Sequence, residues 1–470
     1  MKKSLLAAAV AVACMGTAHA TNWFQLQGTE PNGTAPLYKV FGFIQPTYFS
    51  TGGSTVSGLT AAGAPFNGTA PNFNLVAPQH TSSSSFEIMR ARIAVRGTVL
   101  PISNKIDYFI MAEFGNNGAT QVPGGSVVRL TDASVTFNQI PGARVRVGLF
   151  KAPGAEEMMM GIPAMDYVNF TTVTQQLLFN EFANGNVYVD GPLKGGAGGY
   201  AANVAENDVE RDIGVQVFDW FNNGPWQFTY AGMVGNGAPI NGTQTASQPS
   251  YYARVQESYI FHHSKGPHQA GVTAWLWGHV GHGRLNVSTA TTTTPTATGY
   301  SSQNYTYERF GAGAQFRSSF MTPGAMSATG EWMRGNGWIL VPAAFGVPPG
   351  GATCGAGVTG NPLCTGSIYP GHNNEADGWY LQGGVFATRN VQLEVRYDQY
   401  NRLINSPANE RIFKTWTFGM QYWFSPMARV TLNYAVNRLI VPYPKAAGPN
   451  ADPIANSMDN VISLQTTLMF

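Results

Sequence analysis

Apolar and polar residues alternate with a period of two along many short segments of this chain. The last segment, VISLQTTLMF at residues 461–470, is a clear example. Its even-numbered positions begin with Ile462 and Leu464, whereas its odd-numbered positions include Ser463 and Gln465. Successive side chains of a β-strand point to opposite faces, so this period predicts strands with one apolar and one polar face.

Sixteen segments of this kind are predicted, at residues 38–48, 86–99, 105–114, 128–138, 143–150, 212–220, 226–235, 251–261, 268–280, 305–317, 325–334, 378–387, 391–400, 413–424, 428–438 and 460–470. Short connections with turn residues, such as PISN at residues 101–104, follow the even-numbered segments. Long connections rich in Gly, Thr and Asn follow the odd-numbered segments. The chain thus alternates between tight turns and long loops.

This alternation predicts an all-β fold, a 16-stranded antiparallel transmembrane β-barrel with short periplasmic turns and long extracellular loops. A closed barrel pairs every backbone polar group between strands, which a bilayer requires, and the last strand is expected to pair with the first. A soluble β-sandwich or propeller gives no reason for loops that alternate in length.

Charged residues follow the same period and indicate which face looks inward. In FEIMRARIAVRG, residues 86–97, the side chains of Arg90, Arg92 and Arg96 share one face, and Ile93 and Val95 share the other. A charge on the lipid face costs about 2–4 kcal/mol at the bilayer midplane, so the arginines are predicted to line a polar lumen.

The same parity places further basic residues on the predicted luminal face, namely Lys105, Arg144, Arg146, Arg254, Arg309, Arg317, Arg396 and Arg429. These basic residues outnumber the acidic ones on that face, such as Asp107, Glu113 and Glu331. Rings of arginine select anions, which predicts a modest anion preference. The alternative is that luminal acids neutralise the arginines, as Glu394 and Asp398 would neutralise Arg396, so that the arginines only brace the wall.

Composition and the N-terminus agree with a membrane barrel. Charged residues make up 11% of the chain, against about 25% in a typical soluble protein. Residues 1–20 have the basic start, short apolar run and small-residue ending of a secretory signal peptide, with a Cys14 lipoprotein signal as the alternative. A short segment, 21–37, then precedes a barrel of residues 38–470, which indicates the outer membrane of a Gram-negative cell and contact with its lipid.

Charge and motifs exclude several other functions. Without the signal peptide the chain has 25 basic and 25 acidic residues, so nucleic acid is not an expected partner. No cluster of nucleophile, His and acid points to an enzyme, and no cofactor or metal site is expected. A barrel that acts as a sheath for a surface or redox partner is kept as an alternative, although the chain has no C-x-x-C-H haem motif.

Nine sequence blocks resemble, in order, the strand signatures of the phosphate-selective porin O and P family: FEIMRARIAVRG, LTDASVTF, VRVGLFKAP, RDIGVQVFDWF, QFTYAGMVGNGAP, SATGEWMRG, DGWYLQGGVF, VQLEVRYDQY and FGMQYWFSPMARVTLNY. The likeness runs from about residue 38 to Phe470. It implies a homotrimeric porin whose third extracellular loop folds into the channel, and in which luminal arginines favour small anions.

The predicted third loop, residues 151–211, departs from what a phosphate channel would need. It carries Glu156, Glu157 and Asp166 near its start and is acidic overall. If these residues face the row of Arg90, Arg92 and Arg96, the constriction has a transverse field, which discriminates weakly by net charge. The sequence therefore favours a general porin for small hydrophilic solutes, with a phosphate- or oxyanion-specific channel as the alternative.

Two cysteines, Cys354 and Cys364, remain after the predicted signal peptide is removed. Both fall in one long predicted loop, in an oxidising compartment, and a disulfide between them is expected.

Overall fold

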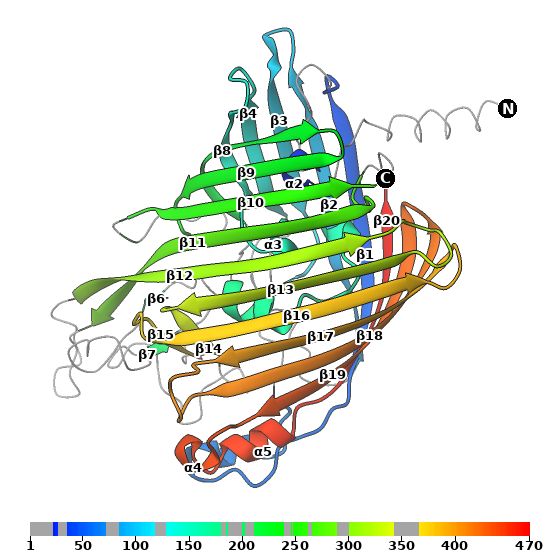
Figure 1. The fold of residues 1–470 in the computed structure, drawn as a ribbon. Coiled ribbons are helices and arrows are strands. Elements are labelled where there is room, and N and C mark those ends of the chain that lie inside the picture. The colour runs from blue at the N-terminus through cyan, green and yellow to red at the C-terminus, as the bar shows by residue number, and fades with distance from the viewer. Residues whose placement is uncertain are drawn as a thin grey trace.

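The computed structural model describes residues 22–26, 35–71, 84–117, 128–179, 185–186, 200–202, 211–238, 246, 248–261, 266–288, 300–342 and 366–470. Most strands belong to one large sheet that closes on itself where β1 pairs with β20 (Figure 1). The sheet has seventeen strands, and one of them, the two-residue β6 (Gly185–Asn186), only adds to the end of β11. The other sixteen form the barrel, so the predicted 16-stranded antiparallel barrel is confirmed.

The barrel strands are β1 (Lys39–Thr51), β2 (Ser84–Val99), β3 (Ser103–Glu113), β4 (Arg129–Phe137), β5 (Arg144–Lys151), β8 (Arg211–Asn223), β9 (Trp226–Gly235), β10 (Ser250–Ile260), β11 (Gly271–Ser288), β12 (Tyr300–Arg317), β13 (Met326–Asn336), β16 (Glu375–Phe386), β17 (Val391–Arg402), β18 (Arg411–Ser425), β19 (Ala428–Ile440) and β20 (Val461–Met469). Each predicted segment overlaps one of them. The largest difference is at β11 and β12, which pair as far as Ser288 and Tyr300, beyond the predicted ends.

The two ends of the barrel sequence close the sheet. Strand β1 pairs antiparallel with β20, and Phe470 exchanges two main-chain hydrogen bonds of 3.0 Å with Gly42. At the long-loop end of this seam, the loop after β1 meets the loop after β19, where the Thr60 amide donates to Asn450 Oδ1 at 2.8 Å. The second loop contains the short helices α4 (Pro444–Ala447) and α5 (Ala451–Asn456) (Figure 1).

The outer face of the barrel is apolar. Leu276, Leu381 and Phe418 lie on three different strands and are each more than half exposed. The residues directly before them, Trp275, Tyr380 and Thr417, are polar or aromatic and buried. Along β17, buried Gln392, Glu394 and Arg396 alternate with more exposed residues in this way. An outer apolar surface and a polar inner surface are typical of a barrel in lipid. No helix among the described residues is long and apolar enough to cross a membrane.

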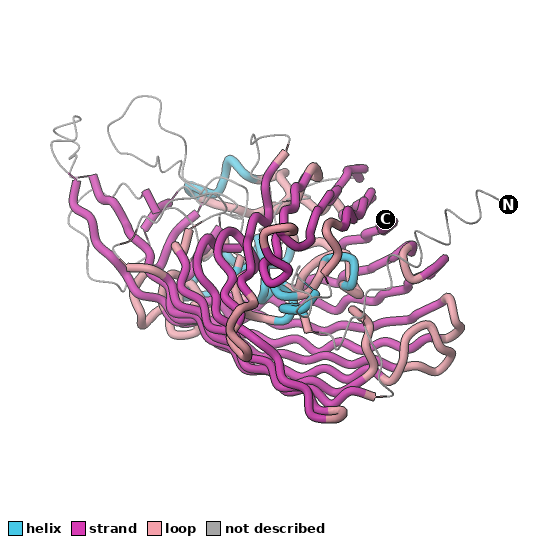
Figure 2. Tube along the Cα trace, turned by 90° about the horizontal axis from the view of Figure 1, so that it is seen from above, coloured by secondary structure: helices cyan, strands magenta, loops and turns pink. Residues whose placement is uncertain are grey.

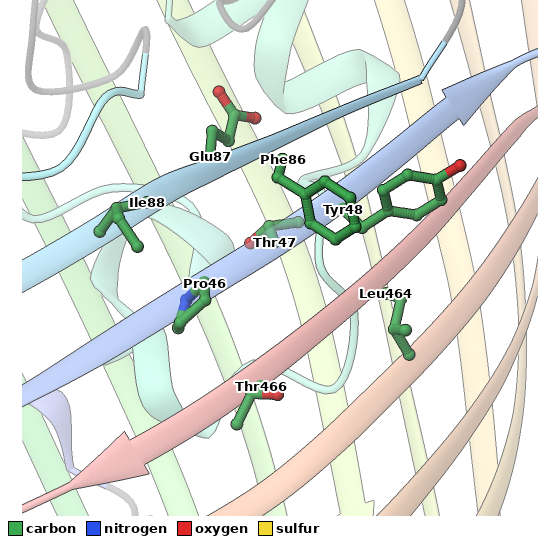
Figure 3. A pocket seen from close by; sticks show the side chains of 8 residues that line it. All are labelled: Pro46, Thr47, Tyr48, Phe86, Glu87, Ile88, Leu464 and Thr466. Carbon is green, nitrogen blue, oxygen red and sulfur yellow. The ribbon is translucent and has the colours of Figure 1, made fainter.

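A groove of about 360 Å³ lies on the outer face over the seam of β1, β2 and β20 (Figure 3). Its floor includes Pro46, which has no amide hydrogen to donate and stands at an irregularity in the pairing of β1 with β2. The aromatic rings of Tyr48 and Phe86 form one side, with centroids 4.7 Å apart. This part of the outer wall is therefore uneven.

The main apolar cluster of the described residues lies inside the barrel. It joins inward-facing aromatic residues of the wall to the N-terminal helix α2 (Trp23–Leu26) and to the start of the third loop. In that loop α3 (Glu156–Met159), the 3₁₀ turn η2 (Ile162–Ala164) and the π-helical turn η3 (Thr174–Leu178) follow one another. Figures 1 and 2 show short helical segments within the ring of strands.

A small second sheet stands at the long-loop end. It consists of β7 (Tyr200–Ala202), β15 (Gly366–Tyr369) and β14 (Ile339–Pro342), in that spatial order. The first strand comes from the third loop and the other two from the loop between β13 and β16. Two loops far apart in the sequence are thus joined by main-chain pairing.

Candidate channel constriction

The third loop turns into the barrel directly after β5. Lys151 ends that strand, and its buried ammonium group donates to the main-chain carbonyls of Met158 at 2.7 Å and Met160 at 2.8 Å. The loop residues from Ala152 to Met160 are all buried. These two hydrogen bonds fix the first bend of the loop, which directs the following residues into the barrel interior.

Glu156 fixes the loop to the wall on the side of β10. Arg254 donates to the Glu156 carboxylate at 2.5 Å and to the main-chain carbonyl of Gly154 at 2.7 Å. The indole of Trp23, from the N-terminal helix, donates to the other carboxylate oxygen at 2.6 Å. Hydrogen bonds to a charged group contribute about 1.5–3 kcal/mol each, so this is a firm attachment.

Glu331, on β13, holds the same bend of the loop through the main-chain amide of Glu156. Its carboxylate accepts hydrogen bonds from the indoles of Trp275 and Trp277, both at 2.8 Å, and from the Tyr380 hydroxyl at 3.0 Å. It also accepts the main-chain amide of Glu156, at 3.1 Å to the nearer oxygen. The side chain is only 3% exposed, and these donors satisfy a carboxylate that burial would otherwise make costly.

Glycines on the inner face make room for these groups. A Cβ atom added to Gly311 would lie 2.7 Å from the Trp277 indole nitrogen, and one added to Gly313 would lie 2.5 Å from the Trp275 ring. On β16, a Cβ atom at Gly378 would lie 2.5 Å from the side chain of Val173 in the loop. The wall therefore admits indole rings and the loop because it lacks side chains at these positions.

Glu157 holds the loop toward β17. Its carboxylate accepts the Thr171 hydroxyl at 2.6 Å and lies 3.6 Å from Arg396. Arg396 in turn donates to the main-chain carbonyl of Asn169 at 3.0 Å and lies 3.8 Å from Asp398. This agrees with the alternative in which Arg396 braces the wall, although its partners include the loop as well as the strand.

Two further loop residues lie against the same region. Asp166 lies 3.8 Å from Arg317 of β12, and Arg429 of β19 donates to the main-chain carbonyl of Met165. The ring of Tyr167 packs 4.4 Å from the Arg396 guanidinium, and burial raises the pKa of the Tyr167 hydroxyl, which therefore stays neutral. Residues 165–167 are in this way held against β12, β17 and β19.

Most of the predicted luminal basic residues are buried. The residues less than a tenth exposed are Arg90, Arg92, Arg144, Arg146, Arg254, Arg309, Arg317, Arg396 and Arg429, whereas Arg96 is half-buried and Lys105 is exposed. Several contact acids of the wall: Arg92 lies 2.6 Å from Glu113, and Arg144 lies 3.1 Å from Asp219.

The remaining arginines have other contacts. Arg309 donates to the main-chain carbonyls of Gly337 and Trp338, both at 3.0 Å. Arg146 lies 4.9 Å from the Phe218 ring centroid, and Arg96 lies 5.2 Å from that of Phe41.

The charges of the loop do not oppose the arginine row as the sequence suggested. Glu156, Glu157 and Asp166 contact arginines of β10, β17 and β12, while Arg92 is paired within the wall. In the row of Arg90, Arg92 and Arg96, Arg90 contacts the loop at the aromatic ring of Phe170, with its guanidinium 5.6 Å from the ring centroid. The reason is the path of the loop, which crosses the interior and reaches the strands on the far side.

The N-terminal helix was not foreseen as part of this site. Asn22 donates to Gln227 and Thr229 of β9, and the Phe24 ring lies 5.9 Å from that of Phe218. The one signal in the sequence is the pair of aromatic residues, Trp23 and Phe24, directly after the predicted cleavage site. In the structure they occupy the interior between the loop and the wall of β8 and β9.

Some predictions fall outside the described residues. These are the signal peptide at residues 1–20 and the expected disulfide between Cys354 and Cys364. Within the described ranges, no group of three or more His, Cys, Asp or Glu side chains is placed to hold a metal ion.

No family model and no curated protein matches this chain. Solved structures with a similar fold include Salmonella typhi OmpF in complex with daunomycin, at 8% identity and a TM-score of 0.50, covering 92% of this chain and 97% of that one. The outer-membrane channel DcaP of Acinetobacter baumannii has 12% identity and a TM-score of 0.47, with 92% and 97% covered. The anion-selective porin from Comamonas acidovorans has 11% identity and a TM-score of 0.48, with 92% and 99% covered.

At these identities the OmpF match bears on the fold alone. The chain has the fold of Gram-negative outer-membrane porins. Because no family model matches, the phosphate-selective porin O and P family remains a resemblance in the sequence.

Proposed function

We propose that this chain is a porin of the Gram-negative outer membrane, through which small hydrophilic solutes and ions diffuse passively. The observation that carries the proposal is a closed barrel with an apolar outer face and a polar inner face, crossed by a loop that attaches both to β10 and to β17. Sixteen strands are enough to enclose an aqueous channel. A loop fixed inside such a barrel would narrow the channel and set the size of solutes that pass.

A modest anion preference is the selectivity that we propose. Arg254 and Arg396 lie beside carboxylates of the loop, which cancels much of their field. Main-chain carbonyls hold Arg309 and Arg429, and these contacts orient a guanidinium group without removing its charge. A mixture of paired and carbonyl-held arginines supports weak selectivity rather than a strongly basic throat.

The two alternatives from the sequence receive less support. A phosphate-specific channel needs arginines that a passing anion can reach, whereas Arg92 is 3% exposed and lies 2.6 Å from Glu113. A barrel acting as a sheath would need an interior free to receive a partner, whereas the third loop and Trp23 occupy part of the interior here.

Ion selectivity in a planar bilayer tests the proposal. Purified protein under a steep KCl gradient should give a current with a small zero-current potential of anion-selective sign, because most luminal charges are paired. Added phosphate should leave the conductance unchanged. Block by millimolar phosphate would favour the oxyanion-specific channel instead, and the absence of any current would contradict a porin.

We also propose a homotrimer, with the uneven face of β1, β2 and β20 as the contact between copies. Phe86 is 86% exposed on this face and borders the outer groove (Figure 3). Phe86→Ala is expected to weaken the trimer in detergent, because an aromatic side chain at an interface contributes a large buried area. Native electrophoresis would show this, with Leu381→Ala as the control, because Leu381 is also exposed on the outer face but lies on β16, four strands away from β20. Equal trimer stability in both variants would contradict this interface.

A further inference from the structure

A small hollow lies between the third loop and the wall formed by β17 to β20. It has about 30 Å³ of room for water-sized molecules, roughly one water. Its buried lining residues include Thr417, Asn433 and Ser463. Its rim includes the half-buried Ala435, which is opposite Thr417 in the strand pairing, and Asn437, which lies nearer the long-loop end of β19. The lining of the hollow is therefore least buried toward the long-loop end of the barrel.

The lining of the hollow is polar but carries no net charge. Of its thirteen lining residues, eight have hydroxyl or carboxamide side chains and three are apolar. The other two, Arg396 and Asp398, have opposite charges and lie 3.8 Å apart. An ion that enters this region loses hydration and meets only charges that are already paired with each other, whereas a neutral solute with hydroxyl groups can exchange hydrogen bonds with the lining.

One hydrogen-bonding group of the wall is left available to such a solute. Thr417 is 3% exposed, and its hydroxyl has no hydrogen-bond partner within the part of the chain that the structure describes. Thr417 stands on β18 directly opposite Arg396 in the strand pairing. A buried hydroxyl without a partner is costly, so a ligand hydroxyl or a water that reached Thr417 would gain a favourable contact.

The contacts that close the hollow are neutral. At its level the loop meets β18 through the hydroxyls of Thr172 and Thr415, 3.3 Å apart. It meets β19 where the Val168 amide donates to Asn433 at 2.8 Å, and β20 where Asn169 donates to Ser463 at 3.3 Å. Neutral hydrogen bonds are weaker than the charged ones that hold Glu156 to Arg254 on the other side.

At the level of the hollow, the charged contacts of the loop lie along β17. They include the bond from Arg396 to the Asn169 carbonyl and the bond of 2.9 Å from the Thr172 amide to Asp398. Arg429 of β19 still holds the loop at the Met165 carbonyl, but residues 168–172 can separate from β18 to β20 by breaking neutral contacts, and this local separation widens the hollow.

We propose that the hollow is the solute path past the third loop, and that its lining is a subsite for small uncharged solutes rich in hydroxyl groups, such as pentoses and polyols. This inference rests on the proposed porin function and specifies the solute class. Ions pass the same path with weak selectivity, because the path presents paired charges and dipoles.

Two variants test the inference in proteoliposomes and bilayers. Ala435→Trp places an indole in the rim, and swelling in an isosmotic pentose should be severalfold slower than with the wild type. The neighbouring Val436→Trp is the matched control, because position 436 faces outward, and its swelling rate should be unchanged. Thr417→Val keeps the shape but removes the hydroxyl, and pentose block of the single-channel current should weaken about two- to tenfold, the loss of one neutral hydrogen bond.

The results separate this inference from the proposed function. If liposomes with Ala435→Trp swell as fast as those with the wild type, the hollow is not the path and the inference is overturned. The inference is also overturned if pentose blocks the Thr417→Val channel as well as it blocks the wild-type channel. Ionic current in the same preparations would still support a porin. If the wild-type protein gave neither ionic current nor swelling, the porin function itself would be contradicted.

Discussion

Replacing Glu331 by alanine is expected to release the first bend of the third loop and to raise the single-channel conductance severalfold. The carboxylate accepts hydrogen bonds from Trp275, Trp277 and Tyr380 and from the main-chain amide of Glu156. A buried donor that loses its acceptor costs about 1–3 kcal/mol, and here four donors lose theirs together. The least costly response is for the loop to move, so that water reaches the indoles and the hydroxyl.

Single-channel recording and thermal melting, read together, would check this prediction. Glu113→Ala is the matched control, because Glu113 is also a buried acid of the wall, and its contacts to Arg92 and to the amides of Ala91 and Gly115 lie within the wall. Both variants should melt at lower temperature than the wild type, but only Glu331→Ala should conduct more. Wild-type conductance in Glu331→Ala would show that the loop does not depend on this anchor.

Removing the aromatic side chains of the N-terminal helix is expected to have the second largest effect. Trp23 and Phe24 are 4% and 1% exposed, and Trp23 also donates to Glu156. Replacement of a buried Trp or Phe by Ala typically costs about 3–5 kcal/mol. The double variant Trp23→Ala, Phe24→Ala should therefore melt at a clearly lower temperature, and its channel should be wider beside β8 and β9.

Single-channel recording and thermal melting would again check this prediction. The size limit at which neutral polymers are excluded would measure the width of the channel. Leu37→Ala serves as control, since Leu37 belongs to the same N-terminal region but is 53% exposed. If the double variant matched Leu37→Ala in melting temperature and exclusion limit, the helix would have no part in the constriction. An effect on melting alone would assign it a structural role only.

The strands were predictable from the sequence because their signal is local. Lipid and lumen act on every strand in the same way, so each stretch repeats the period of two, as VISLQTTLMF does from Val461 onward. The direction of Arg90, Arg92 and Arg96 followed from the same rule, because a charge on the lipid face is costly wherever it occurs. Chain closure through β1 and β20 followed as well, since an open edge in lipid leaves backbone groups unpaired.

The interior was much less predictable. The sequence identified Glu156, Glu157 and Asp166 as acids of the third loop, but it gave no reason to pair them with Arg254, Arg396 and Arg317. It also gave little reason to bring Trp23 into the barrel. The glycines that admit the loop and the indoles, such as Gly313 and Gly378, read in the sequence only as gaps in the strand pattern.

The sequence by itself thus determined the number of strands and the face that each strand turns to lipid. The tertiary structure decided which charges meet, where the loop attaches, and where a hollow is left beside it. The physical reason is separation along the chain. Burial of an alternate residue depends on its neighbours, whereas the contact of Arg254 with Glu156, 98 residues apart, exists only once the barrel has closed around the loop.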